Sequence, residues 1–154
     1  MAEMLIRSYA LHHGISCVIL RLFNVYGFGQ PRDYLIPYLL ECALTRRTAV
    51  VRSPESVRDF VYVSDVIDAM LRAAITNGSL STFNVDAGVP RSIRQVIGEI
   101  SKIMKIEMAW KQPNQVADAE TEIYATCKLI QEQLGWEPRM KFKEGLLEMM
   151  RSIK

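Results

Sequence analysis

Several residue types and patterns that define common protein classes are scarce in this sequence. Its three cysteines, Cys17, Cys42 and Cys127, are odd in number and widely separated, which argues against a disulfide framework and a cysteine zinc site. No apolar run has the length of a membrane span, and the opening residues include Glu3 and Arg7, unlike a signal peptide. We therefore expect a cytoplasmic protein with reduced thiols and no membrane partner.

Motifs that carry catalysis or bind cofactors are also missing. The sequence has no glycine-rich dinucleotide turn, nucleophile elbow, phosphate-binding loop or paired zinc-protease histidines, and Gly27 and Gly29 alone are too weak a signal. The only histidines, His12 and His13, are adjacent near the end of a predicted helix, where we expect solvated side chains. The residues alone thus indicate no catalytic group and no metal ligand.

The charge and composition are those of an ordinary folded domain. The 154 residues carry a formal net charge of +2, with 49% hydrophobic and 23% charged residues, and the densest basic spot is the pair Arg46 and Arg47. Nucleic acid is therefore not an expected partner. The length is enough for one ordinary domain with a buried core.

Apolar periodicity predicts alternating helices and strands, and hence an α/β fold with some parallel pairing. Residues 17–22, C-V-I-L-R-L, are almost continuously apolar, as in a parallel strand covered on both faces. Ser64 is a candidate N-cap, and Ser92 with Gln95 has capping-box spacing. Helices are expected over residues 1–13, 36–46, 64–76, 93–103, 127–134 and 143–150, and strands over 17–22, 50–51, 60–63 and 83–85.

Six segments in fixed order carry a more specific signal. Together they resemble the extended short-chain dehydrogenases that act as NAD-dependent epimerases and dehydratases of nucleotide sugars. The segments are R-L-F-N-V-Y-G (21–27), Y-L-I-P-Y (34–38), R-D-F-V-Y-V-S-D-V (58–66), F-N-V-D-A-G (83–88), Q-V-A-D (115–118) and K-L-I-Q-E-Q-L-G-W-E-P (128–138).

The resemblance implies the C-terminal part of a Rossmann-like parallel sheet with a small mixed α/β substrate-binding subdomain. Residues 1–154 would be one segment, with a residual Rossmann helix and strand in 1–30 and a mostly substrate-binding region in 31–154. The opening A-E-M-L-I-R-S-Y-A resembles the helix that follows the family's catalytic Tyr-x-x-x-Lys. We therefore expect that pair, and the glycine-rich NAD turn, to lie upstream, which leaves this chain no catalytic residue.

The same resemblance implies a set of binding residues. Arg58 would hold the diphosphate with its planar charged fork, and the amide of Asn24 would donate to a diphosphate oxygen. Asp118 would accept hydrogen bonds from ribose hydroxyls. Tyr34 and Leu35 would border the nucleotide, whereas Phe23 and Asn24 would border the nicotinamide of NAD.

Each of these residues also has an ordinary structural interpretation. Asn24 could bond its own turn, Arg58 could form a surface ion pair, and Asp118 could be a solvated loop carboxylate. Tyr34 and Leu35 could simply begin the apolar face of the next helix. Asp59, beside Arg58, is expected to fix backbone geometry rather than bind ligand.

The sequence departs from the family pattern at three places. Gln115 stands where many relatives have a second phosphate-binding arginine, and Arg52 stands where relatives keep a glycine under the nucleobase. Ala125 replaces a helix-capping aspartate, a role that Thr126 could take over. The nucleobase and the sugar therefore cannot be inferred from the sequence.

Three functions remain open from the sequence. The leading hypothesis is the sugar-nucleotide-binding portion of an NAD-dependent epimerase or dehydratase, inactive alone, whose ligand is a nucleotide-diphosphate sugar. The second is a stand-alone binding module, or a subunit completed by another chain. The third is a structural remnant that self-associates, since a missing Rossmann half would leave apolar surface uncovered. We accordingly expect a homo-oligomer or a partner that supplies that half.

Overall fold

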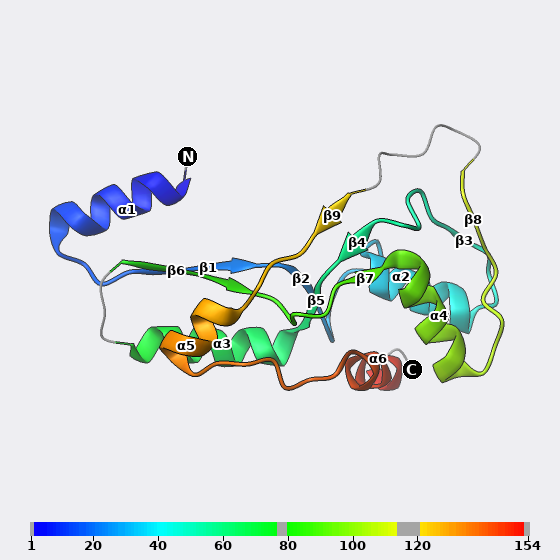
Figure 1. Cartoon of the computed structure of the whole chain (residues 1–154). Helices are drawn as coiled ribbons and strands as arrows, with labels where there is room; N and C mark the ends of the chain where they lie inside the picture. The colour runs from blue at the N-terminus through cyan, green and yellow to red at the C-terminus, as the bar shows by residue number, and fades with distance from the viewer. Residues whose placement is uncertain (1, 77–79, 114–120, 153–154) are drawn as a thin grey trace.

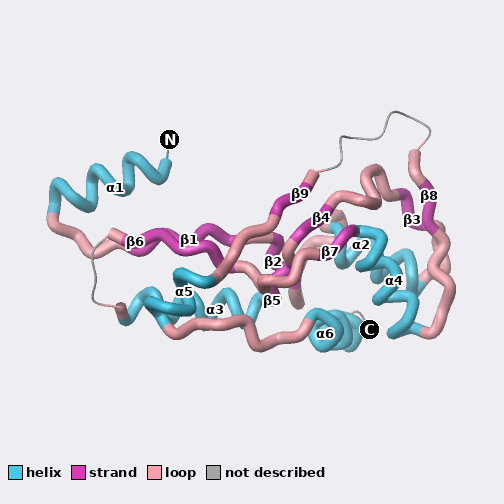
Figure 2. Tube along the Cα trace, in the orientation of Figure 1, coloured by secondary structure: helices cyan, strands magenta, loops and turns pink. Residues whose placement is uncertain are grey.

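The protein is elongated, with helices at both ends and paired strands running between them (Figures 1 and 2). This computed structural model describes residues 2–76, 80–113 and 121–152. The helices are α1 (Ala2–His13), α2 (Leu35–Leu44), α3 (Val63–Ile75), α4 (Ile93–Met104), α5 (Lys128–Leu134) and α6 (Phe142–Ser152). The strands are β1 (Val18–Leu22), β2 (Asn24–Tyr26), β3 (Ala49–Val50), β4 (Val57–Arg58), β5 (Phe60–Tyr62), β6 (Ser81–Val85), β7 (Arg91–Ser92), β8 (Trp110–Lys111) and β9 (Glu122–Ile123).

Parallel pairing dominates the strands. β1 pairs with β6 over five residues, and β2, the next stretch of the same chain, pairs with β5. β3 pairs with β8, and β4 pairs with β9, in the parallel sense as well. Only β4 and β7 run antiparallel among the described strands. This mixture confirms the predicted α/β fold with parallel sheets.

Two apolar cores hold the elements together. The first lies among α2, α4, α6 and the aromatic rings that point from β2 and β5, where Tyr26 stacks edge-on against Phe60 and Tyr62. Gly145 of α6 approaches this cluster so closely that an added Cβ would lie 2.3 Å from the Tyr26 hydroxyl. The second core comprises Val61, Val66, Ala69, Phe83, Val85, Ile130 and Trp136.

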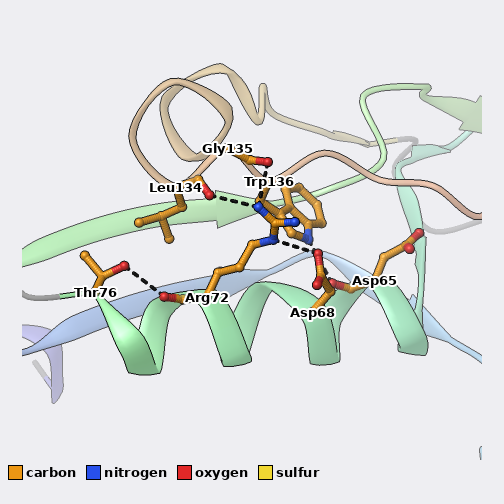
Figure 3. A network of polar contacts seen from close by, with 7 residues as sticks. All are labelled: Asp65, Asp68, Arg72, Thr76, Leu134, Gly135 and Trp136. Atoms are coloured by element: carbon orange, nitrogen blue, oxygen red, sulfur yellow. Dashed lines mark hydrogen bonds and ion pairs between the residues drawn. The ribbon is translucent and has the colours of Figure 1, made fainter.

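A polar network fastens the chain after α5 onto α3 (Figure 3). Arg72 of α3 pairs with Asp68 and donates to the carbonyl oxygens of Leu134 and Gly135. The indole of the fully buried Trp136 donates to the Asp65 carbonyl at 2.9 Å. Because these bonds satisfy the carbonyls at the C-terminal end of α5, that short helix is fixed beside β6.

Most predicted elements are confirmed, but two details of the prediction are wrong. Ser92 and Gln95 form the expected capping box, and Gly14 in the left-handed region follows α1. Ser64, however, does not cap α3, which begins directly out of β5 at Val63 without a side-chain cap. The strand β1 is also not covered on both faces, since its residues are half-buried or exposed.

The first helix explains the exposure of β1. α1 is joined to the strands by polar contacts, from Arg7 to Thr82 and from Glu3 to Arg21, and only Ala10 of the helix is buried. The hydrogen bond with Arg21 lowers the pKa of Glu3, as expected for a charged surface pair. The large exposed apolar side chains of α1 are Met4, Leu5, Ile6, Tyr9 and Leu11.

Candidate functional site

The chain changes its strand partner at Phe23-Asn24, between β1, which pairs with β6, and β2, which pairs with β5. The amide of Phe23 still donates to the carbonyl of Val85, the last residue of β6, at 3.1 Å, whereas the amide of Asn24 donates to the carbonyl of Asp59, just before β5, at 3.2 Å. The chain thus changes partner from one strand to another within two residues. Such a point, at the carboxyl ends of parallel strands, is where ligands bind in open α/β sheets.

Asp59 holds this junction in place. Its side chain is fully buried and accepts hydrogen bonds from the amides of Ala87 and Val89 at 2.7 and 2.8 Å. Its backbone carbonyl accepts a hydrogen bond from the Asn24 side-chain amide at 3.1 Å. The carboxylate therefore fixes the chain after β6, in keeping with the predicted structural role for Asp59.

A second buried carboxylate lies beside it. Asp86 follows β6 and accepts one hydrogen bond from the amide of Gly88, and its other oxygen has no partner among the described residues. Burial, followed by the charge of Asp59, raises the pKa of Asp86 to about 6. The same two carboxylates, after burial itself, raise the pKa of the nearby Cys127 thiol. Asp86 was not among the residues predicted from the sequence.

The cavity at the strand junction, here called the strand-end cavity, has a volume of about 320 Å³. It receives side chains from β2, from the start of α2 and from the loop between them. Four of the predicted binding residues line it together. Its lining residues are Phe23, Asn24, Val25, Tyr26, Gln30, Tyr34, Leu35, Ile36 and Phe60.

The adjoining cavity, here called the arginine cavity, has a volume of about 420 Å³ and shares Leu35 with the strand-end cavity. Among the described residues, two arginines and four hydroxyl side chains line it, and no carboxylate does. Such a lining favours an anionic ligand. Its lining residues are Leu35, Tyr38, Val50, Val51, Arg52, Ser53, Ser56, Arg58, Ile93 and Thr121.

Arg58 enters the arginine cavity with its guanidinium already anchored. One terminal nitrogen donates to the carbonyls of Val57 and Thr121 at 2.8 Å each, and the other donates to the Thr121 hydroxyl at 2.7 Å. The surface ion pair that was the alternative for Arg58 is not among the contacts of the described residues. Asp118 and Gln115 lie outside those residues.

A third cavity, also of about 420 Å³, lies between the loop after β2, α2 and α6. Of its lining residues only Gln30 is shared with the strand-end cavity. Its lining arginine, Arg32, is accompanied by the carboxylate of Glu41. Since this cavity offers both signs of charge, it has less preference for an anion than the arginine cavity.

The arginine cavity also contains residues that sequence reasoning missed. Ser53, Ser56, Tyr38 and Thr121 line the arginine cavity, and none was predicted. Ser53 and Ser56 lie in a turn-like S-P-E-S segment between β3 and β4. Thr121 lies in no quoted motif, so no sequence signal could have found it.

One pattern in the sequence was overlooked. Tyr124 and Lys128 have the Tyr-x-x-x-Lys spacing. Both side chains are exposed, Tyr124 precedes α5, and Lys128 pairs with Glu132. A tyrosine outside the helix that carries the lysine does not place the two groups on one helical face, and neither residue lines a cavity described above.

Metal chemistry and membrane insertion find no support in the part of the chain that the structure describes. Within it, no group of three or more histidine, cysteine, aspartate or glutamate residues could hold a metal ion. None of its helices combines the length and apolar character that crossing a bilayer requires.

Comparison with known proteins identifies the family. The sequence model described as NAD dependent epimerase/dehydratase family matches residues 1–86, more than half of the chain. The chain belongs to this family. Its fold is therefore the Rossmann-like one of the nucleotide-sugar epimerases and dehydratases, as the resemblance implied.

Individual family members agree with this assignment. The UDP-glucose 4-epimerase of Rhizobium meliloti is 26% identical over 89% of this chain and 48% of that protein. UDP-glucuronic acid decarboxylase 3 of Arabidopsis thaliana is 30% identical over 94% of this chain and 43% of that protein. The structure of the Thermotoga maritima UDP-glucose 4-epimerase with UDP-glucose is 29% identical, with a TM-score of 0.85 over 98% of this chain and 50% of that one. The chain spans about half the length of the relatives it matches.

The epimerase/dehydratase family uses NAD, and the residues present provide only an edge of such a site. Phe23 and Asn24 lie at the strand junction, where they could border a nicotinamide. A dinucleotide pyrophosphate, however, is held by a glycine-rich turn between a strand and a helix, and these 154 residues contain none. They therefore do not make a complete NAD site.

Proposed function

We propose that the chain is the sugar-nucleotide-binding half of an NAD-dependent nucleotide-sugar epimerase or dehydratase. The observation that supports this most is the arginine cavity, where Arg52 and Arg58 lie with four hydroxyl side chains and, among the described residues, no carboxylate. Charge of one sign and hydroxyl donors suit a diphosphate. The Thermotoga maritima relative, 29% identical, was solved with UDP-glucose.

The two adjoining cavities suggest how a nucleotide-diphosphate sugar would be held. The diphosphate would lie between Arg58 and the amide of Asn24, with Leu35 as the shared wall of both cavities. The nucleobase would lie toward Arg52, and the sugar toward Phe23 in the strand-end cavity. Asp118 remains the proposed partner of the ribose hydroxyls.

The half-site would bind substrate without transforming it. Hydride chemistry needs a general base with a suitable pKa. Among the described residues that line the arginine cavity or the strand-end cavity, only Tyr26 has a shifted pKa, and burial raises it. A raised pKa makes that phenol a poorer base at neutral pH. We therefore propose an inactive half that needs a second Rossmann half, and we place the complete enzyme in the cytoplasm.

Calorimetric titration tests this function directly. UDP-, dTDP-, GDP- and CDP-sugars would be titrated into the chain with and without NAD, and saturable binding of one sugar nucleotide without NAD is expected. Arg58→Ala should weaken that binding by about 1.5–3 kcal/mol, the scale of a hydrogen bond to a charged group. Arg151→Ala, on the exposed side of α6 and paired with Glu148, is the matched control and should leave affinity unchanged.

A folded chain that binds none of these compounds would contradict the proposal. The second candidate is then a structural role through self-association, which the exposed apolar side chains of α1 and α3 favour. Self-association does not depend on Arg58. Equal oligomer mass for the wild type and Arg58→Ala, with no sugar-nucleotide binding by either, would therefore support the second candidate.

A further inference from the structure

The hydrogen bonds that Arg58 makes with other described residues leave one edge of its guanidinium unused. An arginine has five N–H donors, and three of these are taken by the Val57 carbonyl, the Thr121 carbonyl and the Thr121 hydroxyl. The two terminal nitrogens both bond Thr121, Nη1 through its carbonyl oxygen and Nη2 through its hydroxyl oxygen. The donors left over are the Nε–H and one N–H of Nη2, which lie side by side along the other edge of the planar group.

The unused edge is the one that an anion needs. Two parallel N–H groups on a rigid plane match two oxygens of a phosphate or carboxylate. No contact of the described residues uses this pair of donors. Arg58 lines the arginine cavity, so an anion held there can reach a planar fork whose opposite edge is already fixed.

Thr121 is itself fixed relative to β4. Its amide donates to the Ser56 hydroxyl at 3.1 Å, and its carbonyl also accepts from the amide of Val57 at 2.9 Å. The next two residues, Glu122 and Ile123, pair with β4 as the parallel strand β9. The two Thr121 oxygens that bond Arg58 are therefore held directly beside the paired strands β4 and β9.

We propose that Thr121 is a positioning residue for anion binding, whose hydroxyl and carbonyl orient the guanidinium of Arg58 toward the ligand. Preorganisation of this kind raises affinity because the arginine loses less rotational freedom on binding. The identity of the anion as the diphosphate of a sugar nucleotide rests on the proposed function. The positioning itself does not, because inorganic pyrophosphate presents the same oxygens.

Two substitutions isolate the hydroxyl. Thr121→Val keeps the branched shape and both backbone contacts but removes the acceptor for Nη2, whereas Thr121→Ser keeps that acceptor. Titration with UDP-glucose and with inorganic pyrophosphate should show affinity about fivefold weaker for Thr121→Val, the scale of one hydrogen bond. Thr121→Ser should bind within about twofold of the wild type, and thermal unfolding of each variant checks that it is folded.

A double-mutant cycle separates positioning from a merely structural effect. If Thr121 acts through Arg58, Thr121→Val should change pyrophosphate affinity less than about twofold in an Arg58→Ala background, because the group it orients is gone. An equal loss in both backgrounds, no loss in either, or tighter binding by Thr121→Val would overturn the proposal. Tighter binding would mean that Thr121 competes with the anion.

The two probes keep this inference distinct from the proposed function. If pyrophosphate binds with the expected dependence on Thr121 while the sugar nucleotides do not bind, the proposed function falls and the positioning role stands. If neither probe binds the folded wild-type chain, both are overturned.

Discussion

The carboxylates of Asp86 and Asp59 lie close together near the end of β6. The two carboxylates differ in the number of hydrogen bonds that their oxygens accept. Asp59 accepts two backbone amides, whereas Asp86 accepts one and has a second, buried oxygen without a partner among the described residues. A raised pKa in the folded state means that the fold prefers protonated Asp86. The negative charge therefore destabilises the folded state above the folded pKa of about 6.

The expected consequence is a pH-dependent gain from removing that charge. Asp86→Asn should increase the free energy of unfolding by about 1 kcal/mol at pH 7.5. The gain should shrink as the pH falls from 6 toward 4 and be small at pH 4, because near the ordinary pKa of 3.8 Asp86 becomes protonated in the unfolded state as well. Denaturant unfolding of both proteins at pH 4, 5.5 and 7.5 measures this.

Asp59→Asn is the matched control for Asp86→Asn. Because the Asp59 carboxylate accepts the amides of Ala87 and Val89, an amide at this position cannot accept both in the same way. Asp59→Asn should therefore be destabilising at pH 7.5, by about 1–3 kcal/mol. If both variants shift the free energy of unfolding in the same direction at this pH, the two carboxylates do not differ in how the fold stabilises their charge.

At this scale the recognisable motifs of the sequence led to residues that the structure brings together. Phe23, Asn24, Tyr34 and Leu35 do line one cavity. Thr121 could not be predicted, because its contact with Arg58 depends on the pairing of two strands that are two residues long each. So short a strand shows no periodicity, and its register follows from tertiary packing.

At the scale of elements, Gly145 lets α6 pack closely against the aromatic rings of Tyr26 and Tyr62. The Cβ of an alanine at position 145 would lie 2.3 Å from the Tyr26 hydroxyl and 2.8 Å from the Tyr62 ring. The Tyr26 hydroxyl also donates to the Phe142 carbonyl at the start of α6, so the ring cannot move without breaking that bond. Gly145→Ala should therefore destabilise the protein by about 1–3 kcal/mol, as overpacking does.

Gly98 of α4 provides the comparison within another helix. Nothing lies within 4 Å of a Cβ added there, so Gly98→Ala should raise stability by about 0.5–1 kcal/mol through its better helix propensity. Thermal or denaturant unfolding of the two alanine variants should move in opposite directions. Equal changes would show that α6 is not held as closely as described.

The elements themselves were predictable where local chemistry decides them. The capping box of Ser92 and Gln95 marks the start of α4 because both partners lie within one turn. Ser64 misled because the chain passes from β5 straight into α3, which already includes this residue. The hydroxyl oxygen of Thr126, by contrast, accepts a hydrogen bond from the Lys128 amide at 3.3 Å, although the N-cap residue of α5 is Cys127, which makes no side-chain cap.

At the scale of the whole molecule, apolar side chains remain uncovered on the helices that flank the β1 and β6 pair (Figure 1). On α3 these are Ile67, Met70, Leu71 and Ile75, spaced as one helical stripe. On α1, Met4, Leu5 and Tyr9 are each more than half exposed. We propose that these exposed apolar side chains form interaction surfaces, which a second copy of the chain or another Rossmann half would cover.

The isolated chain should therefore self-associate, because only a second copy is available to cover these side chains. Light scattering over a concentration series should show a dimer or larger species that dissociates on dilution. Leu71→Glu combined with Leu5→Lys, both at exposed positions, should shift the population toward monomer without loss of helical circular dichroism. Lys143→Glu and Glu132→Lys, charge changes at exposed positions of α6 and α5, form the matched control and should leave the mass unchanged. A wild-type chain that stays monomeric at all concentrations would mean that this apolar surface tolerates water, and the expectation of a homo-oligomer would be wrong.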